Sequence, residues 1–330
     1  MWETVDKIVK SGINKIYPGA VLLVGRPGEI LYEKSYGTID GVRKTQLDTI
    51  YDIASLTKVV ATTTAVMKLF EEGLLHLNDR LGYFLPVEGK KADITIFQLL
   101  THTSGMAPYT ELWKHLKGKA LLEEILKIQP VYEPGKIVYS CLNFITLMAV
   151  VEAVSGTSFD EFVYSILYPI GMNNTSFNPE KYENIAPTSI REGKRLIGEP
   201  DDELAYYLGG VSGNAGLFSS ARDLFIFMSA LLKGEIMRKK IVNLFSQHVV
   251  DSNGKRRHLG WEAPYNGSSA GDILLHLDHA FGHTGFTGTS IWCDGEKFVI
   301  LLTNRVFIKR FSEGIGRIRI LLHNVVFGGL

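Results

Sequence analysis

The chain has 330 residues, and its 35 Lys and Arg residues balance its 35 Asp and Glu residues to a formal net charge of zero. Its 45% hydrophobic and 21% charged residues are typical of a globular protein with a sizeable buried core. The basic clusters Arg238-Lys239-Lys240 and Lys255-Arg256-Arg257 are short, and we expect both to be solvated. The charge pattern therefore argues against nucleic-acid binding.

Cysteine content and hydropathy bear on the compartment. The two cysteines, Cys141 and Cys293, are too few for a disulfide framework, and a reducing compartment suits them. The first residues lack the apolar run of a signal peptide, and no apolar stretch reaches the length of a membrane span. We therefore expect a cytoplasmic protein that acts on a small molecule and binds no membrane. The sequence leaves its oligomeric state open.

The N-terminal part of the chain predicts a helix, a hairpin and a second helix. Apolar residues at helical spacing predict an amphipathic first helix, with a stripe formed by Val5, Ile8, Val9 and Ile13. The β-rich runs 20–24 and 30–36 flank a Gly-Pro turn, which indicates an antiparallel hairpin. A helix is then predicted over 52–70, and Ser55 falls near its start.

The remainder divides into a helical stretch and a C-terminal β segment. Residues 74 to 250 favour helices, most clearly at 121–128, 144–154, 159–167 and 221–232, with loops over 173–214. Two apolar strands follow, at 288–293 and 298–302, joined by Asp294-Gly295, a strong hairpin signal. A C-terminal helix is predicted over 311–327.

Strands at both chain ends indicate one shared sheet. The predicted fold class is mixed α and β: an antiparallel sheet flanked by helices, built from residues 1–75 and 251–330. Residues 76–250 form an inserted helical lobe. We expect one structural unit with the active site in the cleft between the lobes, where pockets commonly form.

Ser55-Leu56-Thr57-Lys58 is the first segment with catalytic potential. Residues three apart share a helix face, so the Lys58 ammonium can reach the Ser55 hydroxyl. A serine hydroxyl needs an adjacent base to become a nucleophile, and a lysine can serve when its surroundings lower its pKa. As an isolated pattern, Ser-x-x-Lys more often marks a helix cap followed by a solvated lysine.

Two later segments strengthen the catalytic interpretation. A Pro- and Gly-rich turn delivers Tyr139 to the start of an apolar helix, and Gly282-His283-Thr284-Gly285 leads into a strand. With Ser55 and Lys58, these segments resemble the serine β-lactamase and penicillin-binding-protein superfamily, whose elements are Ser-x-x-Lys, Tyr-x-Asn and Lys/His-Thr/Ser-Gly in that order. The class C branch, which includes esterases and D-amino-acid peptidases, is the most similar. Segments 99–105 and 208–219 also resemble loops of this family.

The resemblance implies a role for each matching residue. Ser55 would be the acylated nucleophile, with Lys58 and Tyr139 moving the proton. The backbone N–H groups of Ser55 and Phe286 would form the oxyanion hole, which is typically worth about 3 kcal/mol per donor. Substrate would lie against His283, Thr284, Gly285 and Cys141. No cofactor is implied.

Two positions depart from the family pattern. Cys141 stands where relatives have Asn, and a thiol is a weak donor and acceptor. His283 stands where many relatives have lysine and carries less charge at neutral pH. Both departures weaken a β-lactamase assignment and favour an ester, which needs fewer anchors. Asn143 cannot replace the missing amide, because it lies on another face of the helix.

Other polar residues have simpler interpretations. His102 is expected to fix a loop, and Asp201-Asp202-Glu203 to form an exposed acidic loop. His276, His279 and His283 lack an acidic partner at the spacing of a zinc enzyme, so no metal site is predicted. Cys141 is a less suitable nucleophile than Ser55.

The sequence thus predicts a serine hydrolase that forms an acyl-enzyme on a small carboxylic ester or on a β-lactam-like or D-configured amide, with esterase favoured. One alternative is a true β-lactamase or D-alanyl peptidase acting on β-lactams or muropeptide fragments. Another is a catalytically dead ligand sensor on the same scaffold, for which Cys141 is the only support.

Overall fold

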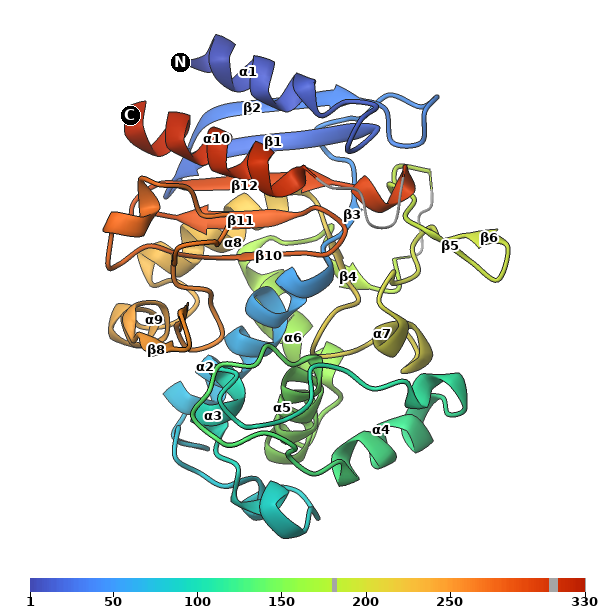
Figure 1. Ribbon diagram of the computed structural model, residues 1–330, viewed down its shortest axis with the longest axis vertical. Helices are drawn as coiled ribbons and strands as arrows, with labels where there is room; N and C mark the ends of the chain where they lie inside the picture. Colours follow the sequence, from blue (N-terminus) through green and yellow to red (C-terminus); the bar gives the residue numbers. More distant parts are fainter. Residues whose placement is uncertain (180–182, 309–313, 330) are drawn as a thin grey trace.

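The computed structural model describes residues 1–179, 183–308 and 314–329. Strands from both chain ends form a five-stranded antiparallel sheet in the order β10-β11-β12-β1-β2 (Figure 1). Its members are β1 (Gly19–Arg26), β2 (Glu29–Gly37), β10 (Phe281–Thr284), β11 (Ser290–Cys293) and β12 (Phe298–Thr303). The fold class predicted from the sequence, with a sheet shared by both chain ends, is therefore confirmed.

Helices cover both faces of this sheet, which explains the continuous apolar run of β1. Ala20, Leu22 and Val24 belong to a buried cluster with α1 (Trp2–Ser11) and α10 (Ile315–Gly329). The alternate residues Val21 and Leu23 face the main core instead, on the side where α8 (Ala221–Lys233) packs against β1 and β12. Figure 1 shows α1 and α10 side by side over one face of the sheet.

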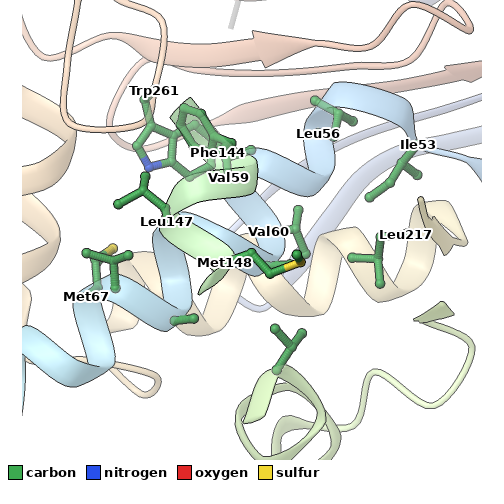
Figure 2. Close-up of a cluster of buried hydrophobic side chains, with 14 of the residues drawn as sticks. Ile53, Leu56, Val59, Val60, Met67, Phe144, Leu147, Met148, Leu217 and Trp261 are labelled. Atoms are coloured by element: carbon green, nitrogen blue, oxygen red, sulfur yellow. The ribbon is translucent and has the colours of Figure 1, made fainter. Parts of the chain in front are cut away.

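The helical part is built around α5 (Cys141–Ser155), in which residues 142–151 are all buried. The helices packed against it are α2 (Thr64–Glu71), α3 (Ile96–Leu100), α4 (Gly118–Lys127) and α6 (Phe159–Leu167). Helix α9 (Lys239–Gln247) packs against α2 and α8, and α7 (Glu203–Tyr207) packs against the 3₁₀ turn Leu112–Lys114. Figure 2 shows how Phe144, Leu147 and Met148 of α5 lie near Val59 and Val60 of the helical segment that follows Ser55. An apolar surface on all sides is what a central helix requires.

Further short strands lie outside the five-stranded sheet and form smaller sheets and hairpins. They are β3 (Tyr51–Asp52), β4 (Ser176–Phe177), β5 (Ile190–Arg191), β6 (Lys194–Arg195), β7 (Leu217–Ser219), β8 (Val250–Ser252) and β9 (Lys255–Arg257). The three-stranded sheet β3-β7-β4 fastens the segment before Ser55 to the loop before α8.

The helix predicted over 52–70 begins differently from expectation. Tyr51 and Asp52 form strand β3, and a 3₁₀ turn and a π-helical stretch (Lys58–Thr63) precede α2. The hydroxyls of Thr63 and Thr64 donate to the carbonyls of Lys58 and Val59, five residues earlier. These side-chain bonds accompany the wider turn, a feature that is frequent at functional sites.

Smaller differences concern the chain ends. Ile13 lies beyond the end of α1, which stops at Ser11. Helix α10 begins at Ile315, and residues 311–313 of the predicted C-terminal helix lie outside the described residues. Within the described ranges, no single helix is long and apolar enough to cross a membrane. The bent pair of α5 with 159–170 reaches that length and composition only when the two segments are taken together.

The central strand β12 should dominate the stability of the sheet. Ile300 is fully buried on β12, the strand that pairs with both β1 and β11. Ile300→Ala should therefore lower the free energy of unfolding by about 2–5 kcal/mol. Ile190→Ala, at a half-exposed position, is the matched control and should change it by less than about 0.5 kcal/mol. Urea unfolding measures both variants, and equal effects would contradict the placement of β12 in the core.

Candidate active site

The backbone before Ser55 is held in an unusual conformation. Ala54 has φ +47°, in the left-handed region that residues with a side chain rarely adopt. The Asp52 carboxylate accepts hydrogen bonds from the backbone N–H of Ala54 and of Asp201, both at 2.8 Å. Burial raises the pKa of Asp52 to about 7, and the nearby acids Asp201 and Asp202 add to the rise. Asp52 therefore fixes the turn that presents Ser55.

Lys58 is fully buried beneath Ser55. Its Nζ donates to Ser55 Oγ at 3.1 Å and to the Asn214 carbonyl at 2.7 Å, and it lies 3.7 Å from Cys141 Sγ. Burial favours the neutral amine, but the interactions of Lys58 with Cys141 and Tyr139 favour the ammonium, and the pKa of Lys58 is raised above its usual value. Lys58 is therefore a cation in the resting site.

The loop that carries Asn214 reaches Lys58 because a glycine precedes it. A Cβ on Gly213 would stand 2.1 Å from the Phe144 carbonyl oxygen, so only glycine allows the loop to lie against α5. The Gly213 carbonyl also accepts a hydrogen bond from Thr62 Oγ1 at 2.6 Å. This close approach explains the small-residue segment found in the sequence.

Tyr139 lies directly before α5, among two histidines and two cations. Its ring centre is 4.5 Å from that of His102 and 6.1 Å from that of His283. Lys58 Nζ and the Arg257 guanidinium lie 5.0 and 5.2 Å from the same ring. Two cations this close to the ring would stabilise negative charge on the phenolic oxygen, as the predicted proton relay requires.

The two histidines beside Tyr139, His102 and His283, form hydrogen bonds to backbone groups and are uncharged. His102 Nδ1 accepts from the Ser140 backbone N–H at 3.0 Å, which is the loop-fixing contact expected of it. His283 Nδ1 donates to the Thr284 carbonyl at 2.9 Å. Burial, followed by the charge of Arg257, holds the pKa of both imidazoles well below the usual value. Neither histidine therefore supplies a positive charge at neutral pH.

The connection after β10 closes the site over Ser55. Thr287 Oγ1 donates to the Asp52 carbonyl at 2.8 Å, and Thr289 Oγ1 donates to the Ile53 carbonyl at 3.0 Å. A Cβ on Gly285 would stand 2.1 Å from Thr289 Oγ1, so a side chain there would force the two segments apart. Phe286 and Ser55 thus line the same cavity, as an oxyanion hole built from their N–H groups requires.

This cavity, of about 460 Å³, brings the predicted residues together with several that the sequence analysis missed. The predicted members on its wall are Ser55, Tyr139, Cys141, His283, Thr284, Gly285 and Phe286. The missed members are Tyr109, Asp202, Arg257, Glu262, Arg305 and Arg319. Lys58 is fully buried next to the cavity, and its Nζ donates a hydrogen bond to Ser55 Oγ.

Two expectations about charged segments are wrong. Arg257 was expected to be solvated with its basic neighbours, but it is only 6% exposed because β9 lies beside Glu262 and β10. The segment 201–203 was expected to be an exposed acidic loop, but Asp201 is buried and Asp202 caps α7. Local sequence carried no signal for either, because the burial comes from segments distant in the chain.

Cys141, which departs from the family pattern, and the nearby Asn143 face different surroundings. Cys141 is the first residue of α5 and contacts Lys58, and burial raises its pKa, so it is a thiol and not a competing thiolate. Asn143 faces the other way, because its side chain bonds to the Leu99 carbonyl and to Ser104 Oγ. Among the described residues, no group of three His, Cys, Asp or Glu side chains is arranged to hold a metal ion.

Ser55 lies in a 3₁₀ turn with a buried lysine, a tyrosine and a Thr-Gly strand end around it, which is an arrangement suited to a serine hydrolase that forms an acyl-enzyme. The Beta-lactamase family model matches residues 5–322. The chain belongs to this family, and at that level it is a serine hydrolase.

Comparison with individual proteins agrees with this assignment. A protein of Escherichia coli (strain K12) named "Putative D-alanyl-D-alanine carboxypeptidase" is 30% identical over 91% of this chain and 81% of its own length. The structure of EstCE1, described as a hydrolase with promiscuous acyltransferase activity, has a TM-score of 0.79 at 22% identity and covers 99% and 98% of the two chains. A class C β-lactamase from Rhodobacter sphaeroides has a TM-score of 0.78 at 18% identity, covering 98% and 99%. The two structures share the fold.

Tyr139→Phe tests the proton relay. Loss of the hydroxyl should reduce kcat/KM for a p-nitrophenyl ester by about 10²–10⁴-fold, because the serine proton then lacks its acceptor. Tyr132→Phe, an exposed tyrosine of the same loop, should remain near wild type. Thermal melting checks that both variants fold, and Ser55→Ala, which should take up no fluorophosphonate in intact-mass spectra, marks the fully inactive limit. Near-normal turnover of Tyr139→Phe would rule out the relay.

Proposed function

We propose that this protein is a carboxypeptidase-type serine hydrolase that removes a C-terminal amino acid from a short D-configured peptide. The observation that carries the proposal is the guanidinium of Arg257, which is buried in the wall of the Ser55 cavity. Its Nε and Nη1 have no hydrogen-bond partner among the described residues. A buried guanidinium with unmade bonds costs about 1–3 kcal/mol per missing bond, and a substrate carboxylate recovers that cost with charge-assisted bonds.

The neighbouring charges also favour an anion. Arg257 Nη2 lies 3.6 Å from Glu262 Oε2, so one carboxylate partly balances it. Arg319 and Arg305 line the same cavity, which leaves more positive than negative charge around the space. Burial, and then repulsion from Arg305, lower the pKa of Arg319 to about 9. A bound carboxylate would offset this repulsion.

The reaction follows from the positions of the side chains. Ser55 Oγ attacks the carbonyl carbon of the terminal peptide bond, and its proton passes to Tyr139, which accepts it as the phenolate stabilised by the nearby Lys58 and Arg257 cations. The N–H groups of Ser55 and Phe286 stabilise the oxyanion. Tyr139 returns the proton to the departing amine, and a water molecule then hydrolyses the acyl-Ser55 ester by the reverse proton path. Substrate is a small molecule in this scheme, and no cofactor takes part.

D configuration is supported by the relative from Escherichia coli, whose name refers to D-alanyl-D-alanine. Ester hydrolysis, which the sequence favoured, is the second candidate. Cys141 in place of an amide and the uncharged His283 support it, because both leave fewer anchors for an acylamino group. The hydrogen bond between Lys58 and Ser55 supports either enzyme over a ligand sensor without catalysis.

Arg257→Met tests the carboxylate anchor. With D-alanyl-D-alanine, kcat/KM should fall about 10–100-fold, equivalent to about 1.4–2.7 kcal/mol, because the charge-assisted bonds are lost. With D-alanyl-D-alaninamide, which lacks the carboxylate, it should change less than about threefold. Mass-spectrometric detection of released D-alanine measures both, and thermal melting checks folding. Equal losses for both substrates would exclude Arg257 as the anchor.

The pH dependence provides a second test. Below about pH 9 Arg319 is a cation and attracts the substrate carboxylate; above this pKa it becomes neutral, and that attraction is lost. The ratio of kcat/KM for D-alanyl-D-alanine to that for its amide should therefore fall as pH rises through about 9 to 10. Taking the ratio removes effects of the catalytic groups, which act on both substrates. A ratio that stays constant up to pH 10.5 would contradict this role of Arg319.

A further inference from the structure

A second cavity opens from Ser55 and carries charge of the opposite sign. It has a volume of about 270 Å³ and shares Ser55, Tyr109, Asp202 and Phe286 with the cavity described above. Its own wall adds Asp201 and Glu203, and none of the arginines of the larger cavity lines it. The space around the nucleophile is therefore basic in one direction and acidic in the other, with Ser55 between them.

Asp202 presents a carboxylate oxygen at the junction of the two cavities. Its Oδ1 accepts from the Ala205 backbone N–H at 2.9 Å, as the N-cap of α7, and from Asn214 Nδ2 at 3.1 Å. No hydrogen bond to Oδ2 is found within the described ranges of the chain. Burial raises the pKa of Asp202, while Lys58 lowers it, so a second cation near the carboxylate would stabilise its charge.

The position of Asp202 is tied to the catalytic lysine. Asn214 donates to Asp202 Oδ1 through its side chain and accepts from Lys58 Nζ through its carbonyl. Neighbouring Glu203 is engaged differently, because Tyr109 Oη donates to its Oε2 at 3.3 Å. Asp202 is thus the carboxylate held by the catalytic framework itself, with an oxygen available to a ligand.

We propose that Asp202 binds a free ammonium group on the acyl part of the substrate, so that the preferred substrate is a zwitterionic dipeptide. Its ammonium lies toward Asp202 in the acidic cavity, and its carboxylate lies toward Arg257 in the basic one. The inference rests on the proposed function for the carboxylate end. It also rests on a separate observation, since Asp202 lines both cavities, whereas Arg257, whose Nε and Nη1 have no hydrogen-bond partner among the described residues, lines only the larger one.

The decisive experiment compares D-alanyl-D-alanine with N-acetyl-D-alanyl-D-alanine, which lacks the ammonium. Wild type should favour the free dipeptide by at least about tenfold in kcat/KM. Asp202→Asn keeps the size of the side chain and an oxygen that can cap α7, and it removes the charge. This variant should lose about 10–100-fold on the free dipeptide and less than about threefold on the acetylated one.

If Asp202 had only a structural role, Asp202→Asn would disturb α7 or Lys58 and would lower kcat/KM equally for the free and the acetylated dipeptide. That outcome, or a wild-type preference for the acetylated dipeptide, would overturn the inference. Glu199→Gln removes a carboxylate from the same loop outside both cavities and is the matched control. Its ratio of the two kcat/KM values should equal that of wild type.

The two ends of the substrate can be tested apart. D-alanine p-nitroanilide and its N-acetyl derivative both lack the leaving-group carboxylate, so their ratio reports the ammonium alone. A preference for the free amine here, with no preference for a C-terminal acid over an amide, would sink the carboxypeptidase proposal and retain the role of Asp202. The reverse result would sink the role of Asp202 only.

A measurement without turnover covers the case in which neither anilide is hydrolysed. D-alaninamide and N-acetyl-D-alaninamide are added during fluorophosphonate labelling of Ser55, and labelling is followed by intact mass. D-alaninamide should slow labelling of wild type at a concentration at least about tenfold lower than its acetylated form, and Asp202→Asn should remove the difference. Equal protection of wild type by both compounds would overturn the inference.

Discussion

The Asp52 side chain and its backbone carbonyl join the three segments from which the active site is assembled. The carboxylate accepts from Ala54 next to the nucleophile and from Asp201 in the acidic loop, while the carbonyl accepts from Thr287 after β10. These bonds hold Ala54 in the left-handed region, and they set Ser55, Asp202 and Phe286 around one space. Because Asp52 is buried, each lost bond would leave a polar group unsatisfied, and this cost disfavours any rearrangement of the three segments.

Positive and negative groups are separated on this frame. Lys58 is buried beneath Ser55 and held by a backbone carbonyl and by the Ser55 hydroxyl, so its charge is directed at Ser55 and not at a substrate in the cavity. Arg257 and Arg319 provide positive charge on one side, and Asp202 provides negative charge on the other. Charges placed in a buried site before substrate arrives need no reorganisation during the reaction, and this preorganisation is the usual source of catalytic and binding energy.

Cys141 and His283, the two departures from the family pattern, have a similar effect on the site. Both replace side chains that would carry strong hydrogen-bonding or charged groups beside the nucleophile, and His283 is kept neutral by burial and by Arg257. The positive charge that many relatives place at the Thr-Gly strand is here supplied from β9 and α10 by Arg257 and Arg319. On the proposed function, the positive charge that would anchor a substrate carboxylate therefore lies on neighbouring elements and not on the strand itself.

The sequence by itself determined the features that depend on local spacing and hydrophobic periodicity. These include the helices around 141–155 and 221–233, the sheet shared by both chain ends, and the pairing of Ser55 with Lys58, which are three residues apart. Only the tertiary structure decided the burial of Arg257 and the position of Asp202 beside Ser55, because β9, α7 and Ser55 are far apart in the chain and meet through long-range contacts. The same contacts turned the predicted helix start at Asp52 into a strand, since pairing of β3 with β7 outweighed the local helical pattern.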